Sequence, residues 1–176
     1  PGYVSAMAAL ITKQLAALHA DTADGDASLL ATPPHVLFSA HGVPVSYITE
    51  QNDPYQRHIE ECVRLISHAV RQEYQSSEVV FDLSYQSRVG PIEWLRPYTD
   101  DMLRSLAGAG VRRLVVVPIS FVSEHIETLE EIDMEYREVG ANLHPCTCYV
   151  TSLNQTLILP AVRAIGKFLF PLARLA

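Results

Sequence analysis

Short apolar runs alternate with longer segments of helical spacing along most of this chain, and this alternation constrains the fold most strongly. The apolar runs are rich in Val, Ile and Leu, as in strands that are covered on both faces. They are Val36 to Ala40, Val79 to Leu83, Leu114 to Ile119 and about Tyr149 to Leu153. The helical segments are Pro54 to Arg71, Pro91 to Ala107, His125 to Val139 and about Gln155 to Lys167. Four successive βα units predict an α/β fold with a parallel sheet, right-handed crossovers and helices on both faces.

The residues before this alternation predict a helix and a loop. Tyr3 to about His19 has apolar residues at helical spacing. Asp21 to Pro34 combines turn formers, acids and a proline pair, which favours a surface loop. We therefore divide the chain into an amino-terminal helix and loop (1–34), a main α/β lobe (35–167) and an apolar tail (168–176). We also expect the natural protein to begin before Pro1, because the first residues already have the character of a helix interior.

Composition narrows the function classes. The 176 residues are 48% hydrophobic and 19% charged, which is typical of a globular domain with a real core. The net charge of -7 argues against nucleic acid, because binding to a duplex depends on basic residues that neutralise phosphates. A cation is a more natural partner. The three cysteines (Cys62, Cys146 and Cys148) cannot all pair and lack the spacing of a zinc site, so we expect the cytoplasm or another reducing compartment.

The sequence does not predict a helix that crosses a membrane. The chain opens without a basic and then apolar leader, and it lacks a run of about 18 apolar residues. The last 21 residues are very apolar but are interrupted by prolines and basic residues. They predict either an amphipathic helix packed on the core or a segment in peripheral contact with a membrane surface.

Polar groups follow three of the predicted strands. In open parallel sheets, ligands bind beyond the carboxyl ends of the strands. Those ends are Ser39 to Gly42, Ser84 to Arg88 and Ser120 to Glu127. His41 stands on the first of them, and an imidazole with a pKa near ~6.5 can accept a proton or bind a transition metal. The alternative is a structural histidine that forms hydrogen bonds.

A column of carboxylates follows the third strand. Glu127, Glu131 and Glu135 recur at intervals of four residues, which places them on one face of the predicted helix. This pattern indicates either a solvated acidic face or a ladder of oxygen ligands that conducts a divalent cation to the sheet edge.

Aromatic residues near the same edge (Tyr47, Tyr85, Trp94 and Phe121) predict either core packing or a slot for a flat macrocycle. Arg88 is either a ligand for a carboxylate of such a molecule or an ordinary surface arginine.

Three blocks of sequence resemble the signature blocks of ferrochelatases, in the same order and with similar spacing. They are SAHGVP around His41, YQSRVGPIEWLRPYTDD from Tyr85 and VVVPISFVSEHIETLEEIDMEY from Val115. The resemblance implies one lobe of a two-lobed, chelatase-like fold built of Rossmann-type repeats. The porphyrin would bind between this lobe and an amino-terminal lobe that has no counterpart here.

The resemblance also implies roles for residues. The catalytic pair of the family falls on His41 and Glu127, and its metal-handling set falls on His41, Glu127, Glu131 and Glu135. Its porphyrin-binding positions fall on Ser39, Tyr85, Gln86, Ser87, Arg88, Trp94 and His125.

The implied activity is insertion of Fe²⁺ into protoporphyrin IX to form protoheme, through distortion of the macrocycle and removal of its pyrrole protons. Fe²⁺ would be a substrate, and we expect neither a resident cofactor nor an iron-sulfur cluster, because no cysteine-rich extension follows. The alternatives are a related chelatase, for cobalt, nickel or a coproporphyrin, and a truncated lobe that binds tetrapyrrole or metal without turnover.

Overall fold

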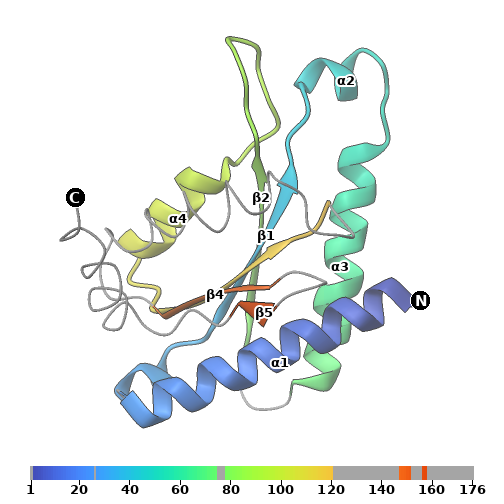
Figure 1. Cartoon of the computed structure of the whole chain (residues 1–176). Coiled ribbons are helices and arrows are strands. Elements are labelled where there is room, and N and C mark those ends of the chain that lie inside the picture. The colour runs from blue at the N-terminus through green and yellow to red at the C-terminus, as the bar shows by residue number, and fades with distance from the viewer. Residues whose placement is uncertain (1, 26, 75–77, 121–146, 152–155, 158–176) are drawn as a thin grey trace, which may run out of the picture.

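The computed structural model of the chain describes residues 2–25, 27–74, 78–120, 147–151 and 156–157 (Figure 1). Five strands form one sheet in the order β2-β1-β3-β4-β5. The strands are β1 (His35–His41), β2 (Val80–Gln86), β3 (Arg113–Pro118), β4 (Thr147–Thr151) and β5 (Thr156–Leu157). The helices are α1 (Gly2–Gly25), the 3-10 helix η1 (Ala27–Ala31), α2 (Val45–Thr49), α3 (Tyr55–Glu73) and α4 (Thr99–Gly108).

The predicted α/β fold is confirmed. Strands β2, β1, β3 and β4 are parallel to their neighbours, and only the short β5 runs antiparallel, against β4. Successive residues of a strand point to opposite faces of the sheet. In β1, Val36 and Phe38 pack in the cluster formed with α1 and α3, whereas Leu37 packs in the cluster formed with α4. Figure 1 shows α1 and α3 side by side, with α4 away from both of them.

Helix α1 is longer than the sequence predicts. It continues from Gly2 to Gly25, so the expected loop from Asp21 is wrong over its first residues, and η1 occupies part of the remainder. The buried face of α1 explains the extension. Thr22 lies one turn beyond the buried Leu18, is itself buried, and donates a hydrogen bond from its hydroxyl to the Leu18 carbonyl at 2.6 Å. A side chain bonded in this way satisfies its own polar group and allows the helix to run on.

Helix α4 is shorter than predicted. It begins at Thr99, so the expected helix start at Pro91 is wrong, and residues 87–98 connect β2 to α4 without regular structure. Pro97 explains the difference, because it lacks an N–H group and disfavours the helical conformation of the residue before it. Main-chain hydrogen bonds from other segments hold this connection instead. They are Val45 N to Glu93 O (2.9 Å), Leu95 N to Val43 O (3.0 Å) and Tyr85 N to Pro97 O (2.8 Å).

The carboxy-terminal part departs from prediction at one further point. Thr156 and Leu157 lie in the segment expected to be the last helix, but they form β5, with Thr156 opposite Thr151 of β4. Thr156 is β-branched, and residues of this type are enriched in strands. The predicted helix from His125 to Val139, the remainder of the last helix and the tail 168–176 lie outside the described residues. The division into 1–34, 35–167 and 168–176 remains a prediction.

Candidate functional site

The direction of the chain connections switches at the carboxyl ends of β1 and β3. From β1 the chain passes through α3 to β2 on one side, and it then returns through α4 to β3 on the other side. In open α/β sheets, ligands bind where the connections diverge in this way. His41 is the last residue of β1, and Ser120 follows β3, so both lie at this edge.

Two side chains, those of Ser120 and Tyr55, hold the backbone of His41 there. The His41 N–H donates to the Ser120 Oγ at 2.7 Å, and the His41 carbonyl accepts a hydrogen bond from the Tyr55 hydroxyl at 2.8 Å. The two hydroxyl oxygens lie 2.9 Å apart. Burial raises the pKa of Tyr55, and the hydrogen bond with Ser120 partly offsets this effect. The Tyr55 hydroxyl is therefore protonated at neutral pH.

Tyr55 and Ser120 were not among the predicted site residues. The sequence offers a signal for the place of Tyr55, although not for the groups that it binds. Tyr55 opens α3, the long helix that comes after the short α2 and leads from β1 to β2, and in a parallel βα unit the start of such a helix lies at the same edge as the end of the strand. The same argument applies to Thr99, which opens α4.

Ser39 and Gln86 belong to a buried polar cluster beneath this edge, on the α4 side of the sheet. The Ser39 hydroxyl donates to the Gln86 Oε1 at 2.6 Å, and it lies 2.9 Å from the Thr99 hydroxyl. The Thr99 hydroxyl also lies 2.9 Å from that of Ser84. Gln86 is only 3% exposed, and its Nε2 has no hydrogen-bond partner within the described part of the chain. A buried amide donor of this kind is available to a ligand or a water molecule.

Tyr85 lies on the other side of β2. Its side chain is 2% exposed and packs in the core with α1 and α3. Burial and, to a smaller extent, the negative charge of Glu60 raise the pKa of Tyr85 to about 12. The structure thus brings Ser39 and Gln86 together and separates Tyr85 from them.

The connection between β2 and α4 carries Ser87, Arg88 and Trp94. Ser87 has a φ of 66°, in the left-handed region that residues with a side chain occupy rarely. Such a conformation is often found where a binding site constrains the backbone. It turns the chain sharply at the end of β2.

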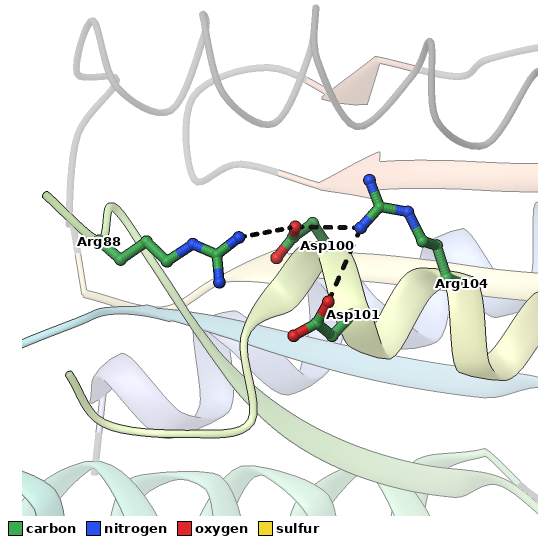
Figure 2. A network of polar contacts seen from close by, with 4 residues as sticks. All are labelled: Arg88, Asp100, Asp101 and Arg104. Carbon is green, nitrogen blue, oxygen red and sulfur yellow. Dashed lines mark hydrogen bonds and ion pairs between the residues drawn. The ribbon is translucent and has the colours of Figure 1, made fainter. Parts of the chain in front are cut away.

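Arg88 takes part in a polar network on the first turn of α4 (Figure 2). It contacts Asp100 at 3.4 Å, and Arg104 contacts Asp100 at 3.1 Å and Asp101 at 3.7 Å. The guanidinium of Arg88 also lies 4.3 Å from the ring centroid of Tyr98. These contacts hold Arg88 against α4, and its predicted contact with a porphyrin carboxylate remains a prediction.

Trp94 packs beside the residue that follows His41. Its indole N–H donates to the Val89 carbonyl at 3.0 Å. Gly42 donates from its N–H to the Gln86 carbonyl at 2.8 Å. A Cβ atom at Gly42 would lie 2.6 Å from that carbonyl oxygen and 3.5 Å from the Trp94 ring. Close approach of the two strand ends therefore requires glycine at position 42.

The remaining predicted residues lie elsewhere. His125, Glu127, Glu131 and Glu135 fall outside the described residues. Among the residues that are described, no three or more His, Cys, Asp or Glu side chains gather in a way that suits a metal ion. Within the same residues, the structure contains no helix with the length and apolar character needed to cross a membrane.

Comparison with known proteins gives one consistent answer. The ferrochelatase family model matches residues 1–159. A ferrochelatase of Gloeothece citriformis is 46% identical over 172 residues, which is 90% of this chain and 40% of that protein. Ferrochelatases of Thermosynechococcus vestitus and Trichodesmium erythraeum are 55% identical over 141 and 140 residues, which is 80% of this chain and 32% of each protein. The chain spans about a third to two fifths of the length of these curated relatives. Because the family model covers nearly the whole sequence, the chain belongs to the ferrochelatase family.

Proposed function

We propose that this chain is the part of a ferrochelatase that carries the proton-accepting histidine, in an enzyme that inserts Fe²⁺ into protoporphyrin IX to form protoheme. The position of His41 carries the proposal. This imidazole stands at the diverging strand ends β1 and β3, in a chain that the family model matches from residue 1 to 159.

The chemistry requires two proton acceptors and a path for the metal. Two pyrrole N–H groups lose their protons as four Fe–N bonds form, and the iron remains ferrous, so no electron donor or acceptor is needed. A neutral imidazole accepts one proton readily near neutral pH. We assign this step to His41. We assign the second acceptor, together with metal delivery, to Glu127, and we assign the supply of Fe²⁺ to Glu131 and Glu135.

We assign the porphyrin contacts to the segments around His41. Trp94 offers an aromatic surface beside Gly42, and Ser87 and Arg88 follow β2 at the same edge. Gln86 has an amide donor that lacks a partner among the described residues, and Ser39 holds the oxygen of the same amide. His125 and Tyr85 complete the predicted set, Tyr85 through its packing beneath the edge. In this proposal the site bends the macrocycle so that the nitrogen lone pairs face the entering metal.

Iron insertion by the complete protein that contains this chain tests the proposal. The test variant is His41→Ala, and the matched control is His68→Ala, because His68 is exposed on α3. Loss of a general base typically lowers a rate by about 10² to 10⁴. We expect a loss of this size in kcat for His41→Ala and no change for His68→Ala. A folded His41→Ala protein that inserts iron at the normal rate contradicts the proposal.

The same assay separates the related chelatases. Co²⁺ and Ni²⁺ are offered in place of Fe²⁺, and coproporphyrin in place of protoporphyrin. A preference of kcat/KM for Fe²⁺ and protoporphyrin is the expected result. A preference for another pair redirects the proposal to the enzyme class that uses it.

Several further expectations belong to the same proposal. We propose that the protein works without a resident cofactor or an iron-sulfur cluster, in the cytoplasm or another reducing compartment. We propose also that its last 21 residues, which include 168–176, are in peripheral contact with a membrane surface. We propose also that an amino-terminal lobe closes the porphyrin cleft opposite residues 35–167. Sedimentation with lipid vesicles, with and without residues 168–176, tests the membrane contact. Visible absorption of the purified complete protein tests for a cluster.

A further inference from the structure

The main-chain ladder between β1 and β3 ends just before the candidate site. Its last hydrogen bond runs from the Ile119 N–H to the Ser39 carbonyl at 3.0 Å. Beyond this bond, the next backbone groups of the two segments form hydrogen bonds with side-chain hydroxyls instead of with each other. The Ile119 carbonyl accepts from the Tyr3 hydroxyl at 3.1 Å, and the His41 N–H donates to the Ser120 Oγ at 2.7 Å. The strands thus separate at the edge without leaving these backbone groups unpaired.

The hydrogen bonds around His41 form a closed ring in which every proton can be assigned. Tyr55 has a single hydroxyl proton, and it donates this proton to the His41 carbonyl at 2.8 Å. The Tyr55 oxygen must then accept from Ser120 at 2.9 Å. The Ser120 oxygen in turn accepts from the His41 N–H. Both backbone polar groups of His41 are therefore held by one connected pair of side chains, from α3 on one side and from the end of β3 on the other.

We propose that Tyr55 and Ser120, the hydroxyl clamp, are positioning residues that fix the backbone of His41 and thereby the place of its imidazole over the substrate. This proposal rests on the proposed function of His41. The residue after His41 is fixed as well, because the Gly42 N–H donates to the Gln86 carbonyl. With anchors on both sides, a small displacement of the imidazole becomes difficult. A shift of about 1 Å at a reacting group can cost about 10²-fold in rate.

The first measurement does not depend on activity. Hydrogen exchange at the His41 amide is compared in Ser120→Ala, Tyr55→Phe and a control, Tyr74→Phe. The control removes the same group from the other end of α3, where the Tyr74 hydroxyl donates to the Leu15 carbonyl at 3.5 Å. We expect exchange at His41 to accelerate about fivefold to tenfold in Ser120→Ala, which removes the acceptor, and less in Tyr55→Phe. The Gly42 amide serves as an internal reference and should keep its protection.

The second measurement is iron insertion by the complete protein. Because the clamp acts on His41 and not on the porphyrin, kcat should fall about fivefold to tenfold in either clamp variant while KM for the porphyrin stays unchanged. Ser120→Thr keeps a hydroxyl and should restore kcat. The two clamp substitutions act on one ring, so their combined effect should be smaller than the product of the single effects.

Three results overturn the clamp. One is a hydrogen-exchange rate of the His41 amide that is the same in Ser120→Ala as in the control Tyr74→Phe. Another is faster exchange with unchanged kcat, and the third is a loss of kcat that Ser120→Thr fails to restore. Failure of the proposed function is a different result, because normal iron insertion by His41→Ala would leave the exchange data on the hydroxyl clamp intact.

Discussion

Substitution of Gly42 by alanine is the sharpest test of how the edge is packed. The new Cβ atom would lie 2.6 Å from the Gln86 carbonyl oxygen. Carbon and carbonyl oxygen atoms normally approach to about 3.3 to 3.6 Å, so the two strand ends would have to separate by roughly 0.7 Å or more. The obstacle is main chain and not the flexible end of a side chain. The Gly42 N–H also donates to this same oxygen at 2.8 Å, so separation would stretch that hydrogen bond.

The cost follows from these two effects. Overpacking typically destabilises by about 1 to 3 kcal/mol, and a weakened hydrogen bond adds about 1 kcal/mol. Replacing glycine by alanine restricts the unfolded chain and returns about 0.4 to 1 kcal/mol. We therefore expect Gly42→Ala to lower the free energy of unfolding by about 1 to 3 kcal/mol.

Urea unfolding of the protein measures this change, and Gly108→Ala is the matched control. A Cβ atom at Gly108, the last residue of α4, would meet no atom within 4 Å. The control should therefore be neutral or stabilised by up to about 1 kcal/mol. A Gly42→Ala protein as stable as the Gly108→Ala protein would refute the packing argument at this edge.

Two further substitutions test the surroundings of the site. Asp100→Asn removes the ion pairs with Arg88 and Arg104. Because both arginines are more than half exposed, we expect the free energy of unfolding to fall by only about 1 kcal/mol or less. The effect should be smaller at high salt, which screens these charges. Urea unfolding at two salt concentrations measures this effect. Asp101→Asn is the control, because Asp101 contacts Arg104 at the longer distance of 3.7 Å. An effect of Asp100→Asn that does not change with salt would argue against an electrostatic origin. The Tyr85 hydroxyl is buried and has no partner among the described residues, so we expect Tyr85→Phe to be neutral or stabilising at pH 7. Burial raises the pKa of Tyr85 to about 12, so between pH 10 and 12 the folded state keeps the phenol proton that the unfolded state loses. The stability of the wild-type protein should therefore fall more steeply over this range than that of Tyr85→Phe. Equal slopes would contradict this reasoning.

The sheet could be predicted because its strands carry their own signal. The runs around Val36, Val79 and Leu114 are apolar on both faces, and their parallel pairing follows from the intervening helices. The position of His41 at the sheet edge follows from the same pattern. The start of α4 was mispredicted because helical spacing from Pro91 outweighed the local effect of Pro97.

The clamp around His41 could not be predicted from sequence. Ser120 is 79 residues away from His41 along the chain, and Tyr55 is 65 residues away from Ser120. Hydroxyl groups are common at strand ends and helix starts, so their presence does not indicate which backbone groups they bind. Only the register of β1 with β3 and the place of α3 bring the three residues together.

The alternation of β1 between two helix layers has a consequence for how this region tolerates insertions and deletions. Val36 and Phe38 serve one hydrophobic cluster, Leu37 serves the other, and Ser39 bonds to Gln86 on the same side as Leu37. Gain or loss of a single residue within the strand would exchange these assignments, since each side chain would turn to the opposite face. Both hydrophobic clusters and the spacing to His41 thus depend on the number of residues in β1, so we expect insertions and deletions within this strand to be poorly tolerated.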